Sequence, residues 1–420
     1  MRTLSSHALA SAVAIAVLSS CASLNARRAS SAACDASGGV MTGVEVLLRD
    51  SLHLIQGKRV GLLTNHSGRD RAGRSTIDLL HTAPGVRLTA LYGPEHGLRG
   101  IAQDGEHVAS SVDSATGVPI YSLYGEVSAP TPEMLRDVDV LLYDIQDAGA
   151  RVYTFEWTLA LSAAAAKKSN IPVIVLDRPD PIRGDRVEGG VLESGLESMV
   201  GQYPVALRYG LTVGELMRYL VGTGKIAADV HVVPMCGWRR SMWLDETGIP
   251  FVIPSPNLRT LDAEALYPGT VFFEGVNVTE GRGTDAPFQL IGAPFLTDAG
   301  DIARELDAMH LGGVRFDSTS RTIEAGHKWG GQTIPMVRVT VTDRNALRPV
   351  DVGVWMLRVM YRRHAADWKW REAHIDRLAG TRALRAAIES GDDAVRALLA
   401  RWDRESRAFA AEREPYLLYR

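Results

Sequence analysis

A glutamate and a histidine stand together at the end of an apolar stretch, in the segment ALYGPEHGLRG (90–100). Gly and Pro are sufficient to bend a chain, so the turn itself needs neither a carboxyl nor an imidazole. Glu95 and His96 are therefore candidates for chemistry. A carboxyl can donate or accept a proton, and the imidazole can tune it through a hydrogen bond or simply support the loop.

Polar side chains follow each of four apolar stretches. The pairs are Asn65 and His66, Glu95 and His96, Asp144 and Asp147, and Asp177 and Asp180. Ligands of open parallel sheets bind outside the carboxyl ends of the strands, where such side chains would meet. Capping or turn formation is the favoured alternative for Asp177 and Asp180, which lie in a Pro-rich turn. Glu is not a turn residue, so a functional interpretation is favoured for Glu95.

A second polar group lies in FFEGVNVTEGRGTDAPF (272–288), a Gly-containing loop that is too polar for a core. Its candidate residues are Glu274, Asn277, Glu280, Arg282 and Asp285. Acid, amide and guanidinium groups together can hold hydroxyls and a carboxylate, the latter through a bidentate Arg. The chain lacks G-x-G-x-x-G after its first predicted strand and lacks a P-loop motif, which disfavours a nucleotide site. No G-x-S-x-G elbow follows a strand, which disfavours a serine hydrolase.

A metal site is the weaker alternative for PEHGLRGIAQDGEH (94–107). The segment holds Glu95, His96, Asp104, Glu106 and His107. Carboxylates and neutral imidazoles can bind zinc, but the spacing matches no zincin pattern. The sequence therefore predicts neither a metal nor another cofactor.

Four near-continuous apolar runs have the composition of parallel strands that are buried on both faces. They are RVGLLTNHSG (59–68), VRLTALYGPEHG (86–97), VDVLLYDIQDAG (138–149) and IPVIVLDRPDP (171–181). Segments with helical spacing lie between them: RSTIDLLHT (74–82), TPEMLRDVD (131–139) and YTFEWTLALSAAAAKKSN (153–170). This βαβα order predicts an α/β fold with a doubly wound parallel sheet.

The following segments predict further elements. TVGELMRYLVGTG (212–224) is expected to be a helix that Thr212 opens, with Glu215 at the capping-box position. ADVHVVPM (228–235) and IPFVIPSPNL (249–258) are expected strands. After about Tyr267 come a Gly-rich stretch, the alternating strand TIPMVRVTVTD (333–343), and amphipathic helices from Val352 onward. These features predict a second, smaller α+β domain.

The N-terminus resembles a bacterial secretory signal, because Arg2 precedes a short apolar run and then small residues in MRTLSSHALASAVAIAVLSSCAS. The run is shorter than a membrane span of ~20 residues. It ends in LSSC, which resembles a lipobox with Cys21 as the lipidated residue; the alternative is an ordinary signal peptide with a coincidental cysteine. A Cys34 to Cys236 disulfide is compatible with the composition but has no support in the spacing.

The expected organisation has four parts. They are a lipoprotein signal peptide at 1–20, a flexible tether at 21–40, the α/β domain at 41–266 and the C-terminal α+β domain at 267–420. The 420 residues are 46% hydrophobic, which is sufficient for a large core, and the formal net charge is −3. No basic block is present, so nucleic acid is not an expected partner.

Six segments in order resemble the exo-β-N-acetylmuramidase (NamZ-type) family of peptidoglycan hexosaminidases, formerly a domain of unknown function. They are GPEHGLRG, LLYDIQDAGARVYTF, VLDRPDPI, GQYPVALRYGLTVGEL, PSPNLRT and EGVNVTEGRGTDAPF. The resemblance runs from about Val44 to the C-terminus. It implies a Rossmann-like α/β domain with a smaller C-terminal domain, a cleft between them, and release of N-acetylmuramic acid from non-reducing ends of peptidoglycan fragments. It also implies that Glu95 is the catalytic acid.

Glycoside cleavage needs a carboxylic acid that protonates the leaving oxygen and a second group that stabilises or attacks the anomeric carbon. Glu95 suits the first role, with His96 beside it. For the second role Glu280, Asp144, Asp147 and the substrate's own acetamido oxygen stay open. The lactyl carboxylate of muramic acid calls for a cation, for which Arg282 and Arg151 are candidates, although structural salt bridging is favoured for Arg151.

The remaining site predictions concern substrate binding. Tyr153, Phe155 and Trp157 could form a sugar platform, although aromatic residues in a helix more often pack in a core. The full set of substrate-binding candidates is Asn65, His66, Asp147, Arg151, Tyr153, Asn257, Asn277, Arg282 and Asp285.

The sequence thus predicts a lipid-tethered glycosidase of the cell envelope that acts on muropeptides or disaccharides during cell-wall turnover. Its membrane contact would be the lipid anchor only. Ala22 stands where an Asp would favour inner-membrane retention, so a periplasmic lipoprotein of the outer membrane is expected. The alternatives are a non-catalytic muropeptide-binding lipoprotein and a metal-dependent hydrolase.

Overall fold

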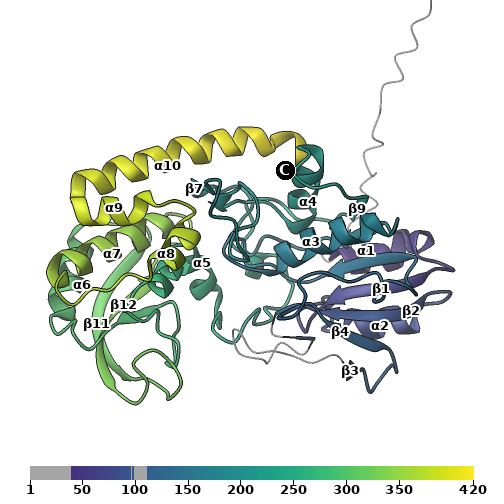
Figure 1. Cartoon of the computed structure of the whole chain (residues 1–420), viewed down its shortest axis with the longest axis horizontal. Helices are drawn as coiled ribbons and strands as arrows, with labels where there is room; N and C mark the ends of the chain where they lie inside the picture. The colour runs from purple at the N-terminus through teal and green to yellow at the C-terminus, as the bar shows by residue number, and fades with distance from the viewer. Residues whose placement is uncertain (1–38, 96, 99–110) are drawn as a thin grey trace, which may run out of the picture. The chain divides into compact units, whose positions relative to one another are not determined.

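The structure is a computed structural model that describes residues 39–95, 97–98 and 111–420 (Figure 1). The predicted signal peptide, Cys21 and nearly all of the tether lie outside the described residues, as do His96, Asp104, Glu106 and His107. Cys236 is disulfide-bonded. The Cys34 to Cys236 bridge, which the sequence allowed without supporting it, involves a residue outside the described ranges, Cys34. None of the described helices combines the length and the hydropathy needed to cross a bilayer.

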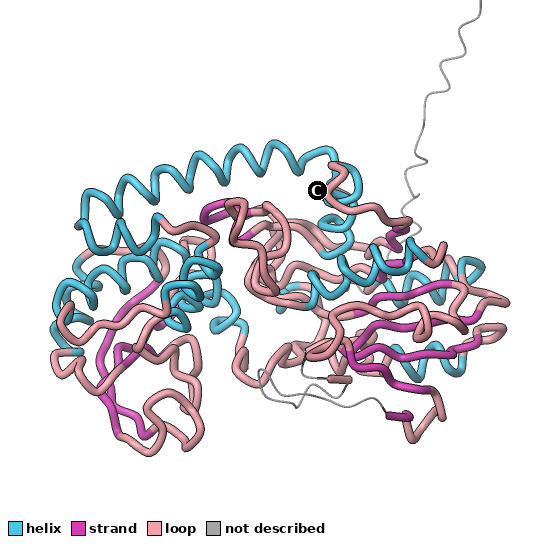
Figure 2. The backbone as a smooth tube through the Cα atoms, viewed as in Figure 1, coloured by secondary structure: helices cyan, strands magenta, loops and turns pink. Residues whose placement is uncertain are grey.

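A seven-stranded sheet forms the centre of the N-terminal part, in the order β3-β4-β2-β1-β5-β6-β9 (Figure 2). The strands are β1 (Arg59–Thr64), β2 (Arg87–Gly93), β3 (Ser111–Val112), β4 (Pro119–Ser122), β5 (Val140–Asp144), β6 (Val173–Leu176) and β9 (Val230–Val233). All neighbours pair in parallel except β3 with β4. The four predicted parallel strands are confirmed as β1, β2, β5 and β6. The strand order reverses between β1 and β5, which is the switch point of a doubly wound sheet.

Helices cover both faces of this sheet. They are α1 (Gly43–Asp50), α2 (Thr76–Thr82), α3 (Phe155–Lys168) and α4 (Val213–Gly222). Leu47 of α1 and Leu80 of α2 share one buried cluster with Leu62 of β1. Trp157 of α3 and Leu216 of α4 belong to another cluster, on the opposite face. This arrangement confirms the doubly wound α/β prediction.

The predicted start of α4 is also confirmed. The Thr212 hydroxyl accepts a hydrogen bond from the Glu215 amide at 3.2 Å, and the Glu215 carboxylate accepts one from the Thr212 amide at 3.0 Å. Two otherwise unpaired amide groups at the helix end are satisfied in this way.

Two predicted elements are wrong. Residues 131–139 form turns rather than a helix, because so short a segment makes only a marginal helix. Residues 249–258 form an irregular segment rather than a strand. Pro250, Pro254 and Pro256 remove three amide donors that a sheet would need.

The C-terminal part contains the antiparallel sheet β10-β12-β11 with helices around it. Its elements are β10 (Leu290–Gly292), β11 (Val314–Thr322), β12 (Thr333–Val341), α5 (Leu261–Thr270), α6 (Ala299–Ala308), α7 (Pro349–His364), α8 (Glu372–Ala379), α9 (Ala383–Ser390) and α10 (Asp392–Arg413). The short elements of the chain are the hairpin β7 (Glu188–Val191) and β8 (Ala206–Arg208), and the 3-10 helices η1 (Leu52–Leu54), η2 (Leu244–Glu246), η3 (Val271–Gly275) and η4 (Glu414–Tyr416). The predicted strand at 333–343 and the helices after Val352 are confirmed.

The core is continuous between the two parts. One buried cluster runs from Leu63 and Tyr143 of the parallel sheet to Val339 of β12 and Trp402 of α10. The predicted boundary between residues 266 and 267 falls within α5. Where the chain divides into domains stays a prediction.

Candidate active site

The turn that follows β2 carries Glu95 into a cavity of about 220 Å³. Segments from both parts of the chain line this cavity. The lining residues are Glu95, Tyr124, Val152, Tyr153, Thr154, Met199, Val200, Ser255, Leu258, Tyr267, Glu274, Arg282 and Phe288. An acid, a second acid, a cation and three tyrosines thus face a mostly apolar space, which is the composition of a small-ligand site.

The local backbone places Glu95 at a fixed position. The Gly97 amide donates to the Pro94 carbonyl at 2.9 Å, which closes the turn, and Gly97 has a φ of 67°, a conformation that favours glycine. The Glu95 side chain is half-buried, and the Thr154 hydroxyl donates to its Oε2 at 2.8 Å. Thr154 directly precedes α3, so the end of a rigid helix holds the carboxyl.

The second acid of the cavity is Glu274, in η3. Its Oε1 accepts a hydrogen bond from Nη2 of Arg282 at 2.9 Å, and its Oε2 lies 3.6 Å from Nε2 of His374. The Arg282 guanidinium also lies over the ring of Phe288, 5.1 Å from the centroid. A charge-assisted ion pair and a stacked ring therefore fix the cationic wall of the cavity.

Glu280 supports this wall from behind. Its carboxylate lies 3.4 Å from Nε of Arg282 and 3.2 Å from Nζ of Lys328. Burial by itself would raise the pKa of Glu280, but the charges of Lys328 and Arg282 outweigh it, so the pKa lies below its ordinary value. Lys328 also donates to the carbonyls of Phe273, Val276 and Val278 at 2.9 to 3.0 Å. Ion pairs and hydrogen bonds among Glu274, Glu280, Arg282 and Lys328 thus hold the predicted loop 272–288 in place.

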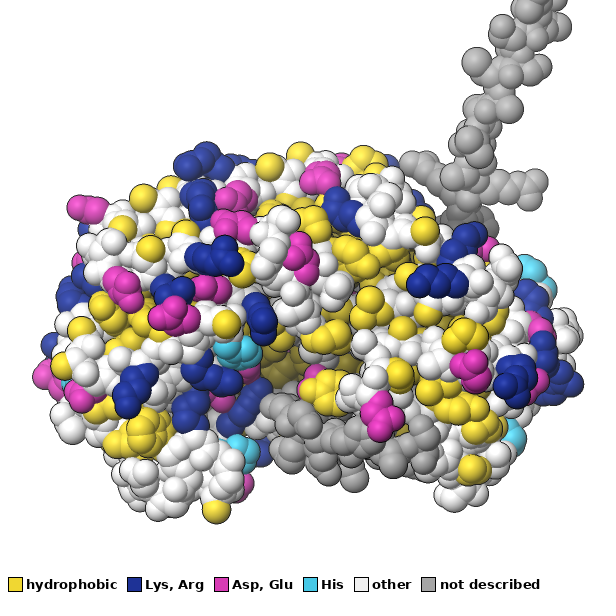
Figure 3. Space-filling view, in the orientation of Figure 1, with side chains coloured by type: hydrophobic (Ala, Val, Ile, Leu, Met, Phe, Trp, Pro, Cys, Tyr) yellow, Lys and Arg dark blue, Asp and Glu magenta, His cyan; other side chains and the backbone are white. Residues whose placement is uncertain are grey.

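Basic side chains gather on the C-terminal side of the hollow that Figure 3 shows in the middle of this face. Arg371 donates to the Glu274 carbonyl at 3.0 Å, and Arg259 donates to the Thr284 carbonyl at 3.3 Å. Both side chains are exposed. An anionic ligand is favoured at such an edge.

Family models match both parts of the chain. The model described as exo-beta-N-acetylmuramidase NamZ, N-terminal, matches residues 60–262, and the corresponding C-terminal model matches residues 265–419. The chain belongs to the NamZ exo-β-N-acetylmuramidase family. The resemblance predicted from the six motifs is therefore confirmed.

Individual proteins agree with this assignment to the NamZ family. Peptidoglycan beta-N-acetylmuramidase NamZ of Bacillus subtilis (strain 168) is 42% identical over 381 residues, which are 90% of this chain and 91% of that protein. Crystal structures of two DUF1343 family proteins from Bacteroides fragilis NCTC 9343 superpose with TM-scores of 0.84 and 0.72, at 35% and 28% identity. Each covers 91% of this chain and 99% of the solved one. The Rossmann-like fold with a smaller C-terminal part is thereby confirmed.

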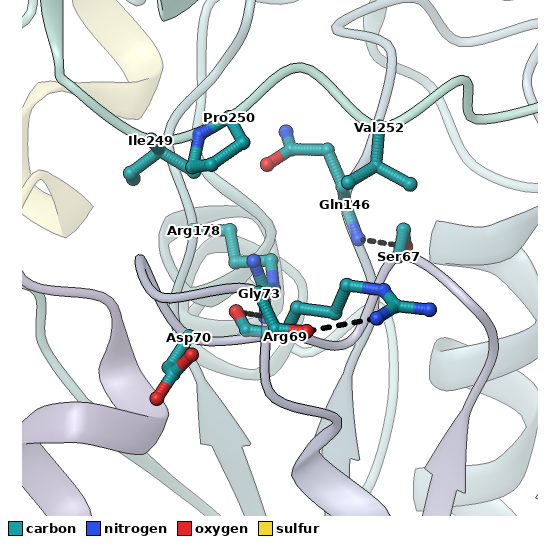
Figure 4. A pocket seen from close by; sticks show the side chains of 9 residues that line it. All are labelled: Ser67, Arg69, Asp70, Gly73, Gln146, Arg178, Ile249, Pro250 and Val252. Carbon is teal, nitrogen blue, oxygen red and sulfur yellow. Dashed lines mark hydrogen bonds between the residues drawn. The ribbon is translucent and has the colours of Figure 1, made fainter.

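In this NamZ-family chain Asp144 lies outside the cavity of Glu95. It is buried at the end of β5 and forms a bidentate ion pair with Arg178, with Nε to Oδ1 at 2.5 Å and Nη2 to Oδ2 at 3.0 Å. The Thr76 hydroxyl also donates to it. Beside this ion pair, at the switch point, lies a separate pocket of about 20 Å³ (Figure 4). Such a pocket has room for about one water and not for a sugar.

Asp147 also lies away from the cavity, in a buried group of carboxyls. Its companions are Glu156, Asp180 and Glu264, and all four are at most 2% exposed. The Tyr209 hydroxyl donates to Asp147. Burial raises the pKa of each of the four carboxyls, for Asp180 to about 8. These four carboxyls therefore belong to the interior and not to the cavity of Glu95.

Arg151 is buried and belongs to the core of the NamZ fold. Its guanidinium donates to the carbonyls of Leu378 at 2.9 Å and Val205 at 3.3 Å, and burial lowers its pKa to about 9. Its partners are carbonyls and not the carboxylates that a structural salt bridge would supply. It lies outside the cavity lining and connects α8 to the N-terminal part.

Of the three predicted platform residues only Tyr153 lines the cavity. Phe155 and Trp157 are fully buried in the core, as the alternative predicted. Burial, with acidic neighbours that include Glu264 and Glu95, holds the pKa of Tyr153 well above its ordinary value. Its hydroxyl has no hydrogen-bond partner in the part of the chain that the structure describes. Tyr153 is thus a neutral phenol in the cavity wall, and its hydroxyl is buried.

The other predicted binding residues are engaged elsewhere. Asn65 accepts two hydrogen bonds from Ser67, and His66 contacts the Ile253 carbonyl at 2.6 Å, beside a cavity of about 540 Å³. Asn277 and Asp285 lie in the loop 272–288 but do not line the cavity. Asn277 donates to the Asp367 carbonyl, and Asp285 pairs with Arg321 at 2.9 Å. Asn257 is buried between the lining residues Ser255 and Leu258.

Glu274, Thr154 and Tyr267 line the cavity of this NamZ-family chain, although none of them was among the predicted site residues. Glu274 was noted in the polar loop without a catalytic role, Thr154 was hidden as a helix-start residue, and Tyr267 lies in a helix that was not predicted. In the sequence, only the many polar residues of the loop 272–288 indicated that Glu274 could belong to a site. Among the described residues no group of three or more His, Cys, Asp or Glu is arranged to hold a metal ion.

Proposed function

We propose that the chain is an exo-acting β-N-acetylmuramidase that releases N-acetylmuramic acid from the non-reducing ends of peptidoglycan fragments. The observation that carries the proposal is the cavity shared by both family-matched parts, into which Glu95 projects. Membership of the NamZ family and the 42% identical peptidoglycan β-N-acetylmuramidase support it. The substrates are peptidoglycan-derived disaccharides or longer fragments.

In this mechanism Glu95 is the general acid. Its proton goes to the bridging oxygen as the bond between that oxygen and the anomeric carbon breaks, and the sugar develops oxocarbenium character. The Thr154 hydroxyl at 2.8 Å holds the carboxyl in place. The Tyr153 side chain forms part of the cavity wall beside this acid. No step of this reaction requires a cofactor.

Arg282 is the residue that we propose for recognition of the lactyl carboxylate. It is the one cation among the described residues that line the cavity. Its guanidinium pairs with Glu274 at 2.9 Å and with Glu280 at 3.4 Å, and Lys328 supplies a second cation to Glu280. A planar Arg presents five donors, so it can bind these carboxylates and the carboxylate of the substrate together.

Replacement of Glu95 by Gln tests the acid role. On a disaccharide that ends in muramic acid, we expect kcat to fall by about 100-fold or more while binding persists. An aryl muramic acid glycoside with a very acidic leaving group should lose much less, because that leaving group departs without a proton. A non-catalytic muropeptide-binding lipoprotein would show no turnover of either substrate with the unmodified chain.

Metal dependence is tested separately by chelation. Because acid catalysis by Glu95 needs no metal, we expect the release of muramic acid to continue at an unchanged rate after dialysis against EDTA. Loss of activity that zinc restores would instead support the metal-dependent hydrolase.

We further propose that Cys21 carries a lipid and holds the enzyme in the cell envelope, on the periplasmic side of the outer membrane. The support is the signal-like N-terminus, the LSSC segment and Ala22 after the cysteine. Cys21→Ser should move the protein from the membrane fraction to the soluble fraction without changing its kcat. Membrane association of this variant would contradict the anchor.

A further inference from the structure

We infer that Glu274 supplies the second carboxylate of the reaction, the group that acts at the anomeric carbon opposite the acid. This inference rests on the proposed function and names the partner of Glu95. Glu95 and Glu274 are the two acids among the described residues that line the cavity. Glu274 comes from η3 of the C-terminal part, whereas Glu95 follows β2 of the N-terminal sheet.

The other acidic candidates are engaged in the interior. Asp144 is locked to Arg178, and Asp147 lies among the buried carboxyls. Glu280 is 4% exposed and holds Lys328 and Arg282 together without lining the cavity. Burial and ion pairing leave none of these three carboxylates in contact with the cavity.

The two acids of the cavity have opposite surroundings. Glu95 receives a hydrogen bond from the neutral hydroxyl of Thr154, whereas Glu274 pairs with a guanidinium at 2.9 Å and lies 3.6 Å from His374. Unequal environments assign two carboxyls to different roles in glycosidases. The Arg282 guanidinium can only donate, which fits a group that acts as a carboxylate, whereas the Thr154 hydroxyl can donate or accept and so fits an acid that gives up and regains a proton.

The network behind Glu274 gives it a fixed direction. The Arg371 guanidinium donates to its carbonyl, Arg282 to its carboxylate, and Lys328 to the carbonyl of the preceding residue, Phe273. Its side chain is 19% exposed, so a ligand can still reach the carboxylate. Catalytic geometry depends on such support.

The reaction balances with Glu274 in this role. The Glu95 proton goes to the leaving oxygen as its bond to the anomeric carbon breaks. The new bond forms either from a Glu274 oxygen, giving an ester that water later hydrolyses with Glu95 as base, or from a water whose proton Glu274 accepts. Carboxyls about 5 to 5.5 Å apart favour the first route, and about 6.5 to 9.5 Å the second.

The test compares Glu274→Gln with Glu95→Gln on the disaccharide and on the activated aryl glycoside. We expect Glu274→Gln to lower kcat by about 100-fold or more on both substrates, because attack at the anomeric carbon is needed whatever the leaving group. Glu324→Gln is the matched control. It is an exposed glutamate on the loop after β11, outside the cavity lining, and its kcat should equal that of the unmodified chain.

Chemical rescue separates catalysis from support. In Glu274→Ala, sodium azide should restore aryl release and yield a glycosyl azide, since azide attacks the anomeric carbon in place of the carboxylate or the water. The anomer, read by NMR, reports which route operates, and either anomer supports the inference.

Two results would overturn the inference. One is a Glu274→Gln enzyme with unchanged kcat, and the other is a Glu274→Ala enzyme that is folded, inactive and not rescued by azide. In both cases turnover by the unmodified chain leaves the proposed function standing. Failure of the unmodified chain to release muramic acid would instead contradict the function itself.

Discussion

Thr154 shows how one hydroxyl can set the geometry of an acid. Its Oγ donates to Glu95 at 2.8 Å, although the two residues are 59 positions apart. Thr154 precedes α3, but its side chain makes no capping hydrogen bond to the helix. The hydroxyl therefore serves the carboxyl and not the helix, and its removal should affect catalysis more than stability.

Thr154→Val is expected to lower kcat by about tenfold with little change in KM, because a lost hydrogen bond of about 1 to 1.5 kcal/mol lets the acid leave its position. Steady-state kinetics on the disaccharide measure this effect. Thr154→Ser keeps the hydroxyl and should restore most of the rate. An equal loss in both variants would assign the effect to packing instead.

At the scale of elements, α5 and α7 cross at two glycines. A Cβ added to Gly353 would overlap the backbone of Gly269, and one added to Gly269 would overlap the Pro349 carbonyl. Backbone atoms cannot move aside as a side chain can, so the crossing requires glycine in both helices. Because α5 carries Tyr267, this contact also positions one wall of the cavity.

Gly353→Ala should therefore lower the free energy of unfolding by about 1 to 3 kcal/mol, although Ala is the better helix former. Urea denaturation followed by circular dichroism measures it. Gly300→Ala in α6 is the control, since its added Cβ would meet atoms at 3.5 Å or more. This control should be neutral or stabilising by up to about 1 kcal/mol. A stable Gly353→Ala protein would mean that the helices can separate at no cost.

At the scale of the whole molecule, the C-terminal segment joins the two parts. Helix α10 packs Trp402 against Gly190 of β7, and the segment after it returns to the N-terminal sheet. The Tyr419 hydroxyl donates to Asp177 at 2.6 Å, and the Leu418 amide donates to Glu215 at 2.8 Å. The parts that share the cavity are thus tied by packing and by hydrogen bonds.

The buried carboxyls predict how global stability depends on pH. Burial raises the pKa of Asp180 to about 8 in the folded chain, whereas an unfolded Asp has its ordinary value of 3.8. Between about pH 5 and pH 7 the folded form keeps a proton that the unfolded form has lost, so stability falls as pH rises. Asp180→Asn should remove about 1.4 kcal/mol per pH unit from this slope, measured by denaturation at several pH values.

Asp285→Asn provides the comparison for that slope. Arg321 lowers the pKa of Asp285, so Asp285 changes the pH dependence of stability only below about pH 5. Between about pH 5 and pH 7 the Asp285→Asn variant should therefore show the same change of unfolding free energy with pH as the unmodified chain. Equal slopes for Asp180→Asn and the unmodified chain would show that Asp180 is ionised in the fold.

Much of the architecture was predictable from the sequence, because periodicity and capping are local. Four apolar runs specified β1, β2, β5 and β6, and Thr212 with Glu215 specified the start of α4. The six motifs identified the family, and the unusual placement of Glu95 identified the cavity acid. In residues 249–258 the apolar pattern predicted a strand, but the prolines prevent the sheet hydrogen bonds that a strand needs, so the prediction from periodicity was wrong.

Only the tertiary structure decided which polar residues meet. Asp144 and Glu95 have the same pattern in sequence, each at the end of a strand, yet one is neutralised by Arg178 and the other opens into a cavity. Glu274 and Thr154 face that cavity from distant segments. Chain folding sets these pairings, since ion pairing, burial and exposure depend on neighbours that no local sequence pattern contains.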